Sequence, residues 1–106
     1  MAERVEKVLR KLRRELEGIY GPRLRGVYLF GSRARGEAEA ESDVDVLIVL
    51  DRLDRYGVEL ERTGEAASRL SIEAGLSISR VFVSEREWRE SQSPFFQNVR
   101  EEGVPA

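Results

Sequence analysis

The strongest constraint in this chain is the run DVDVLIVL at residues 43–50, in which two aspartates alternate with valines and lead into an unbroken apolar series. Successive side chains of an extended strand point to opposite faces of a sheet, so this run places apolar residues on both faces. Such a strand is typical of the centre of a sheet that is buried on both sides. The run therefore predicts a layered architecture built around a central strand.

Helical and strand patterns alternate along the rest of the chain. Some stretches repeat apolar residues at the spacing of one helical face, and others are rich in β-branched and aromatic residues. These patterns predict helices near residues 5–19, 53–74, 84–88 and 93–103, and strands at 25–30, 43–50 and 76–83. Helices interleaved with three strands predict a small α/β or α+β fold. No repeat or linker interrupts residues 1–106, which predicts a single domain.

Histidine and cysteine do not occur in the sequence of 106 residues. Their absence excludes Ser-His triads, thiolate metal sites, cysteine nucleophiles and disulfides, so any chemistry must use carboxylates, hydroxyls and backbone groups. The formal net charge of −2 does not point to nucleic acid or to a membrane as the partner. Because the charged N-terminus lacks an apolar signal core and no apolar run approaches membrane-span length, we expect a cytoplasmic protein.

Residues 31–45, with the sequence GSRARGEAEAESDVD, combine features that favour a phosphate and metal site. Gly31 follows a predicted strand, and its missing side chain lets backbone amides approach a ligand closely. Ser32 adds a hydroxyl, and the residues after it can begin a helix whose N-terminal amides favour an anion. Arg33 and Arg35 could pair with phosphate oxygens or could hold the loop through its glutamates, and the sequence leaves both alternatives open.

Asp43 and Asp45 stand two residues apart at the start of the predicted central strand, which places both carboxylates on one face of the sheet. Their Cα atoms are expected to lie roughly 6–7 Å apart. Carboxylates at this spacing can converge on Mg²⁺, which prefers oxygen ligands, and could bridge two ions about 3.5–4 Å apart. A lone pair of aspartates near a turn is also typical of a solvated loop, so it is the conjunction with the Gly-Ser turn that favours a site.

GSRARG followed by SDVD resembles the signature of the minimal nucleotidyltransferases of the polymerase-beta-like superfamily. That signature is GSxARG, a short spacer, and SDxD leading into an apolar strand, and here it occupies residues 31–36 and 42–45. The element order and the C-terminal SPFFQNVREEGVPA are also similar to the family's small members, so the resemblance covers essentially the whole chain. It implies the polymerase-beta-like nucleotidyltransferase fold, with a small mixed three-stranded sheet flanked by about four helices.

The resemblance also implies a substrate, a cofactor and a partner. The implied nucleotide contacts are Gly31, Ser32, Arg33, Arg35 and Ser42, and the implied metal ligands and catalytic residues are Asp43 and Asp45. The reaction would transfer a nucleoside monophosphate, AMP from ATP, to an acceptor hydroxyl with the help of Mg²⁺ at one or two sites. Minimal members are commonly encoded beside a helical HEPN-domain protein and act as its antitoxin, so the expected partner is of that type.

One feature departs from the family pattern. Active members usually carry a third acidic residue on a later strand, but the matching strand at residues 76–83 contains Ser77, Ser79 and Arg80 and no acid. Glu73 is the nearest carboxylate. The departure keeps an alternative open, in which the chain is a non-catalytic nucleotide-binding module that neutralises a partner by binding. The sequence does not decide between a monomer and a homo-oligomer.

Two other groups of residues have weaker functional interpretations. Three aromatic residues near the C-terminus could stack a nucleotide base, but their helical spacing favours core or interface positions: Trp88, Phe95 and Phe96. Three arginines of the first helix could contact RNA, but the interleaved glutamates favour a solvated face: Arg10, Arg13 and Arg14.

Overall fold

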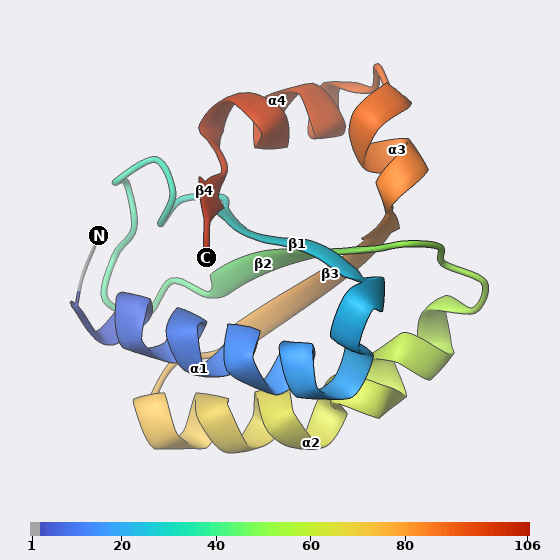
Figure 1. The fold of residues 1–106 in the computed structure, drawn as a ribbon. Coiled ribbons are helices and arrows are strands. Elements are labelled where there is room, and N and C mark those ends of the chain that lie inside the picture. Colours follow the sequence, from blue (N-terminus) through green and yellow to red (C-terminus); the bar gives the residue numbers. More distant parts are fainter. Residues whose placement is uncertain (1–2) are drawn as a thin grey trace.

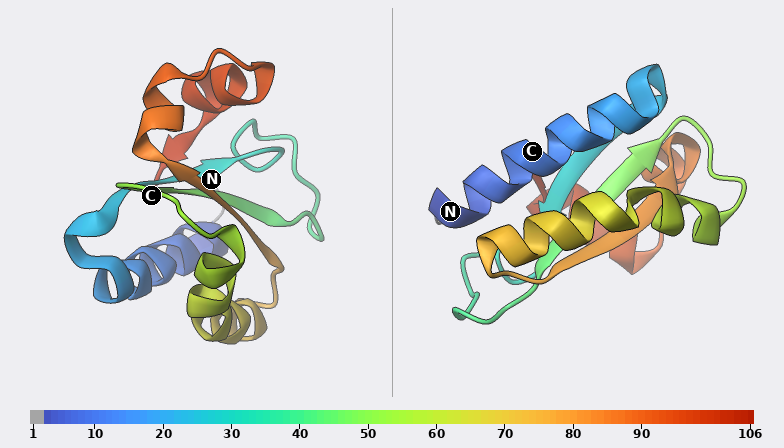
Figure 2. Two further views of the ribbon diagram at one scale, coloured as in Figure 1. Left: turned by 90° about the vertical axis from the view of Figure 1, so that its right-hand side faces the viewer. Right: turned by 90° about the horizontal axis from the view of Figure 1, so that it is seen from below.

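The computed structural model describes residues 3–106 and places helices on both faces of one β-sheet (Figure 1). Helices α1 and α2 lie side by side on one face, and α3 and α4 cover the other, as the turned views also show (Figure 2). In chain order the elements are α1 (Glu3–Tyr20), the short 3-10 helix η1 (Gly21–Arg23), β1 (Leu24–Phe30), β2 (Val44–Leu50), α2 (Tyr56–Ala74), β3 (Ile78–Ser84), α3 (Glu85–Glu90), α4 (Pro94–Glu102) and β4 (Val104–Pro105). None of the helices within residues 3–106 is long and apolar enough to cross a membrane.

The sheet has the strand order β3-β2-β1-β4, with β2 antiparallel to β1 and parallel to β3. The predicted α/β fold with a mixed sheet and four helices is confirmed, but the sheet has four strands and not three. The additional strand, β4, has two residues and pairs with Tyr28 and Leu29 of β1. A two-residue strand that contains proline has no alternating pattern, which is why the sequence did not reveal it.

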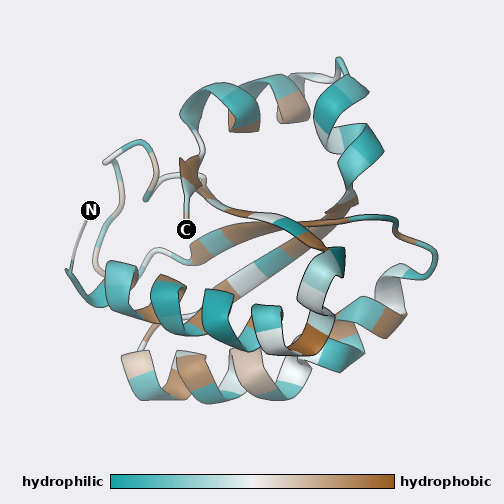
Figure 3. Cartoon of the chain, in the orientation of Figure 1, coloured by the Kyte–Doolittle hydropathy of each residue, from teal (hydrophilic) through white to brown (hydrophobic). Residues whose placement is uncertain are grey.

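The central strand β2 is buried on both faces, as its apolar run predicts. Its side chains alternate between two separate cores, and each residue from Val46 to Leu50 is 0% exposed. Val46 and Ile48 pack toward α1 and α2, whereas Leu47 and Val49 pack toward α3 and α4. Figure 3 shows the apolar strands enclosed by helices whose outer surfaces are hydrophilic. Asp45 shares the face of Leu47 and Val49, so its carboxylate belongs to the layer of α3 and α4.

The predicted helix starts agree with the structure in most places. The capping box at α3 is formed as expected, since the Glu87 amide donates to Ser84 Oγ at 3.1 Å and the Ser84 amide donates to Glu87 Oε1 at 3.4 Å. Ser93 occupies the N-cap position of α4 without a side-chain capping bond, and proline follows it in the first turn. Helix α2 begins at Tyr56 and not near residue 53.

Two amides at the outer edge of β3 are bonded by side chains of α2. The Ile78 amide donates to Ser71 Oγ at 3.3 Å, and the Phe82 amide donates to the Tyr56 hydroxyl at 3.2 Å. An edge strand with free amides invites pairing with another chain, and these bonds block such pairing along β3. Contacts with a partner are therefore expected on the helices or at the loops.

Candidate nucleotide and metal site

The predicted site lies at one end of the sheet, where the loop of residues 31–43 connects β1 to β2 (Figure 1). Phe30, the last residue of β1, pairs in register with Asp45 of β2. This pairing brings the Gly-Ser turn, which follows Phe30 directly, against the second aspartate of the motif. The antiparallel register thus brings Gly31-Ser32 against Asp45, although twelve residues, 33–44, lie between them in the chain.

Gly31 is required at its position for two independent reasons. Its φ of +79° lies in the left-handed region, which residues with a side chain rarely adopt. A Cβ atom added at Gly31 would lie 2.4 Å from Oδ2 of Asp45, closer than real Cβ contacts allow. The carboxylate of Asp45 therefore rests directly against the backbone of the turn, so the turn and the carboxylate form one site.

The turn after Gly31 is a compact loop and not the start of a helix. The amides of Ala34 and Arg35 donate to the Gly31 carbonyl at 3.1 and 3.2 Å, and the Glu37 amide donates to the Ser32 carbonyl at 2.9 Å. The sequence allowed either a short turn or a helix here, and the structure shows the turn. The amides of Ser32 and Arg33 donate to no partner among residues 3–106, so these two N–H groups can donate hydrogen bonds to an anion.

Arg33 holds the loop through backbone carbonyls. Its Nε donates to the Ser42 carbonyl at 3.0 Å, and its Nη2 donates to the Ser42 and Ala40 carbonyls at 2.7 and 3.3 Å. The Ser42 hydroxyl in turn accepts from the Glu39 amide at 2.9 Å. Of the two alternatives for Arg33, the structure shows loop fixation, although through carbonyl oxygens and not through glutamates. Nucleotide contacts by Arg33 and Ser42 stay predictions.

Arg35 links the loop to the C-terminal helix. Its Nε bonds to Glu37 Oε2 at 3.0 Å, and its Nη1 lies 3.5 Å from Glu102 Oε2 on α4. The hydrogen bond to Glu37 is the main cause of a raised pKa for Arg35, so the guanidinium stays charged. Its positive charge also partly opposes the rise in the pKa of Asp45 that burial and Asp43 cause. Because both ion pairs of Arg35 are exposed, a phosphate group can compete for this guanidinium.

Asp43 and Asp45 are close enough to repel one another. Asp43 precedes β2 by one residue and is exposed, whereas Asp45 lies within β2 and is half-buried. The pKa of Asp45 is raised, first by burial and then by the negative charge of Asp43, and the charge of Arg35 only partly opposes this. A half-buried carboxylate beside a second carboxylate is an arrangement that a bound cation would stabilise.

The donor set of this pair fits a hard cation such as Mg²⁺, which binds oxygen ligands and commonly takes only one or two carboxylates together with substrate phosphates. No cluster of three or more acidic, histidine or cysteine side chains able to hold a metal occurs in residues 3–106. The remaining ligands would therefore come from the phosphates and from water. This is the composition expected of a metal that arrives with a nucleotide.

The position beside Asp45 on β3 is occupied by Ser79. Asp45 and Ser79 are register partners in the parallel pair of β2 and β3, so their side chains leave the same face of the sheet. Glu73, the nearest carboxylate in the sequence, lies on α2 and binds Lys11 of α1. Because these two helices cover the other face of the sheet, Glu73 does not replace a third acid (Figure 1).

An open pocket of about 230 Å³ lies beside the turn and includes residues that the sequence did not assign to the site. It is lined by Phe30, Gly31, Arg35, Phe95, Asn98, Val99 and Glu102. The rings of Phe30 and Phe95 meet edge to face at 5.6 Å between centroids, and Phe95 is 41% exposed. Phe96, in contrast, is buried in the core. Neighbouring residues of a helix point in different directions, so Phe95 is partly exposed while Phe96 is buried. The position of Phe95 beside Phe30 and Gly31 depends on how α4 packs against the end of β1.

Comparisons with known proteins agree with this geometry. The sequence model of the family described as "Nucleotidyltransferase domain" matches residues 9–101. MJ0604 of Methanocaldococcus jannaschii, whose name marks it as a candidate protein adenylyltransferase, is 32% identical over 99 residues, which cover 92% of this chain and 93% of the relative.

Two solved structures extend the likeness to the fold. A toxin–antitoxin crystal structure with AMP-PNP has a TM-score of 0.62 and 26% identity, covering 94% of this chain and 70% of the other. A candidate minimal nucleotidyltransferase has a TM-score of 0.56 and 27% identity, covering 96% and 95% of the two chains.

The family match and the likeness to solved structures identify a nucleotidyltransferase with the polymerase-beta-like fold. This chain belongs to the nucleotidyltransferase domain family, and within it to the minimal type.

Proposed function

We propose that this chain transfers AMP from ATP, in the presence of Mg²⁺, to a hydroxyl group of a helical HEPN-type partner and thereby acts as an antitoxin. The observation that carries the proposal is the contact between Gly31 and Asp45, which places an anion-accepting turn directly against a carboxylate pair. The similarity to a toxin–antitoxin structure with AMP-PNP and to a protein adenylyltransferase supports AMP as the transferred group and a protein as its acceptor.

Each residue of the site has a distinct task in this proposal. The free amides of Ser32 and Arg33 donate hydrogen bonds to phosphate oxygens of the triphosphate, and Arg35 can exchange its exposed carboxylate partners for another phosphate oxygen. Asp43 and Asp45 would hold Mg²⁺, which when bound neutralises phosphate charge during transfer. The clamp of Arg33 keeps the loop folded so that these groups share one geometry.

The proposed transfer forms one bond and breaks one. The acceptor oxygen attacks the α-phosphorus of ATP, the bond from the α-phosphorus to the β-phosphate oxygen breaks, and pyrophosphate leaves. The proton of the acceptor hydroxyl passes to solvent. Ser79 stands beside Asp45 at a position where a carboxylate could have taken this proton. Because serine does not act as a base here, the acceptor hydroxyl is poorly activated and we expect slow transfer.

The test is transfer of label from α-labelled ATP to the co-expressed helical partner in the presence of Mg²⁺. We expect the label on the partner, its loss in Asp45→Asn, and its retention in Asp54→Asn, which changes an exposed carboxylate outside the site. Absence of label with the wild-type chain, or equal labelling with Asp45→Asn, would contradict the proposed activity.

A second candidate function is neutralisation by binding alone. The observation that favours it is Ser79 beside Asp45, which leaves two carboxylates where a third would help catalysis. Calorimetry with the partner distinguishes the two functions. Tight binding by the double variant Asp43→Asn, Asp45→Asn, together with unmodified partner in the wild-type reaction, would support the binding module.

A further inference from the structure

The groove between α1 and α2 gathers basic side chains on the face of the sheet that lies opposite Asp45. Four of them follow one another along α1 at spacings of three, four and three residues, which places them on one helical stripe: Arg4, Lys7, Lys11 and Arg14. They line two adjoining hollows of about 160 and 400 Å³. Both lysines of the chain stand in this groove.

Carboxylates of the two helices occupy only part of this stripe. Glu73 of α2 pairs with Lys11, and Glu15 of α1 pairs with Arg69, a fifth basic residue in the groove. The pKa of Glu73 is lowered, chiefly by its bond to Lys11 and also by the charges of Arg69 and Lys7. The Glu73–Lys11 pair shows that a carboxylate on a neighbouring helix can reach a cation of the stripe.

Three of the cations have no such partner. Within residues 3–106, no carboxylate lies within ion-pair distance of Arg4, Lys7 or Arg14. The groove therefore has a net positive charge, although the whole chain has a net charge of −2. A local charge opposite in sign to that of the whole protein is a feature that selects a complementary partner.

The shape and chemistry of the groove favour a helix over a nucleic acid. Its floor between the cations is apolar and consists of Val8, Leu70 and Ala74. No aromatic side chain is among the described residues that line the two hollows, so bases would find no stacking platform. Because Val8 and Leu70 are already only 3% and 2% exposed, a third helix laid along α1 and α2 would gain chiefly by presenting carboxylates to the cations.

We propose that the α1–α2 groove is a docking surface for an amphipathic helix of a protein partner that carries carboxylates at the matching spacing of three, four and three residues. The proposal does not rest on nucleotide transfer, because the groove and the carboxylate pair lie on opposite faces of the sheet (Figure 1). Loss of transfer in Asp45→Asn therefore leaves docking intact, and loss of docking leaves the nucleotide site intact.

The first test uses the two lysines as reporters. The probe is a blocked helical peptide of about five turns with glutamates at this spacing beside leucines. The control is a peptide of the same composition with its glutamates spread around the helix. Lysine acylation read by mass spectrometry should show Lys7 and Lys11 protected by the first peptide and not by the second. Equal protection by both peptides, stronger protection by oligouridine, or no protection at about 1 mM peptide would overturn the proposal.

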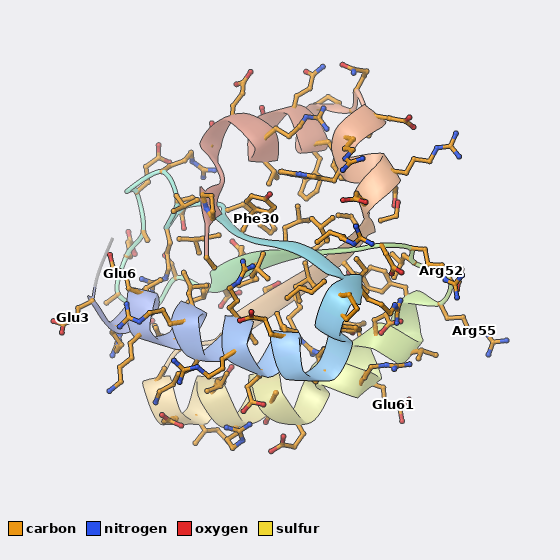
Figure 4. The ribbon with its side chains drawn as sticks, viewed as in Figure 1. Glu3, Glu6, Phe30, Arg52, Arg55 and Glu61 are labelled. Carbon is orange, nitrogen blue, oxygen red and sulfur yellow. The ribbon has the colours of Figure 1, made fainter. Side chains whose placement is uncertain are left out.

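The second test measures peptide affinity by fluorescence anisotropy. The variant Arg4→Glu, Lys7→Glu, Arg14→Glu should bind the patterned peptide on the order of tenfold more weakly, since it removes three charge pairs and adds repulsion. A matched variant reverses three exposed arginines elsewhere, Arg52→Glu, Arg55→Glu, Arg86→Glu, and should bind as the wild type does. Arg52 and Arg55 project away from the body of the molecule (Figure 4). Equal affinity of the two triple variants would overturn the proposal.

Should the charge-reversed variant fail to fold, a neutral variant keeps the test decisive. Arg4→Gln, Lys7→Gln, Arg14→Gln retains residues of high helix propensity and is expected to fold. It should bind the patterned peptide several-fold more weakly than the wild type does, because the attraction is lost without added repulsion. Unchanged affinity of the folded neutral variant would overturn the proposal as well.

Discussion

The two ends of β2 carry acidic residues in opposite electrostatic settings. At the end near the turn, Asp45 is half-buried beside Asp43, and its pKa is raised by burial and by that second negative charge. At the other end, Asp51 accepts a hydrogen bond from Arg23 Nε at 3.0 Å. This bond and one from the Arg52 amide outweigh the opposing effect of desolvation and lower the pKa of Asp51.

A buried glutamate, Glu59, lies near the Asp51 end of β2 and shares Arg23 with Asp51. Glu59 is only 5% exposed and accepts a hydrogen bond from the Tyr20 hydroxyl at 2.7 Å. Arg62 lies 3.3 Å from the same carboxylate, and Arg23 lies 4.0 Å away. The pKa of Tyr20 is raised by its burial and by this bond to Glu59.

The difference between the two ends separates acids that hold the fold from acids that are available to a ligand. Buried charge is tolerated where cations and hydrogen bonds satisfy it. The far end of β2 meets this condition within the chain itself, whereas the end at Gly31 leaves two carboxylates with only partial compensation by Arg35. We infer that the setting at the Gly31 end is kept for an external cation.

The largest expected effect is on transfer and comes from Asp45→Asn. The proposed Mg²⁺ would stabilise the charge of the transition state by several kcal/mol. Removing one of its two carboxylate ligands should therefore lower the transfer rate roughly 100-fold or more. The free energy of unfolding at pH 7 should not fall, because the substitution removes a repelling charge. Initial rates of label transfer and thermal unfolding test the two halves of this prediction. Full activity, or a clear loss of stability, would contradict the distinction between the two ends.

Gly31→Ala should damage both stability and activity. The left-handed φ costs an alanine roughly 1–2 kcal/mol. The alanine Cβ would also lie 2.4 Å from Oδ2 of Asp45, so the carboxylate would have to move. Gly36→Ala is the matched control, since Gly36 has a φ of +75° and open space around it. Gly31→Ala should lose more stability than Gly36→Ala in denaturant titrations, because only Gly31 adds a steric clash to the φ cost, and only Gly31→Ala should lose transfer activity. Equal losses of activity would show that the contact with Asp45 is not important.

Glu59→Ala should affect stability alone. Loss of a hydrogen bond to a charged group costs about 1.5–3 kcal/mol, and the Tyr20 hydroxyl would be left without its partner. Glu61→Ala serves as the control, because Glu61 is on the same helix and points to solvent (Figure 4). Folded Glu59→Ala should keep its transfer activity. A loss of transfer that exceeds the loss of folded protein would argue against a purely structural role for this end.

The smallest effects are in the pH dependence of stability, and they should have opposite signs at the two ends. Asp45 has a raised pKa in the folded state, so its contribution to stability decreases as the pH rises through its normal range toward the raised pKa. Asp51 has a lowered pKa, so its contribution is present above the normal aspartate pKa and is lost as the pH falls below it.

Unfolding curves of Asp45→Asn and Asp51→Asn between acidic and neutral pH test these signs. Relative to the wild type, Asp45→Asn should gain stability as the pH rises, whereas Asp51→Asn should lose it. The same direction of change in both variants would remove the electrostatic contrast between the two ends.

The sequence by itself determined the local elements and the identity of the family. The alternation of apolar residues in 43–50 predicted a strand buried on both faces, and each residue from Val46 to Leu50 is fully buried. The capping box of Ser84 and Glu87 was predicted and is formed. These features depend on residues within a few positions of one another, and for that reason spacing alone reveals them.

Only the tertiary structure decided how the site is assembled. The contact of Gly31 with Asp45, the clamp of Arg33 on the Ser42 carbonyl and the place of Ser79 beside Asp45 depend on strand register and loop closure. The proximity of Phe95 depends on the packing of α4 against the end of β1. Such contacts join residues that are distant in the chain, and no local periodicity records which residue a strand or helix will face.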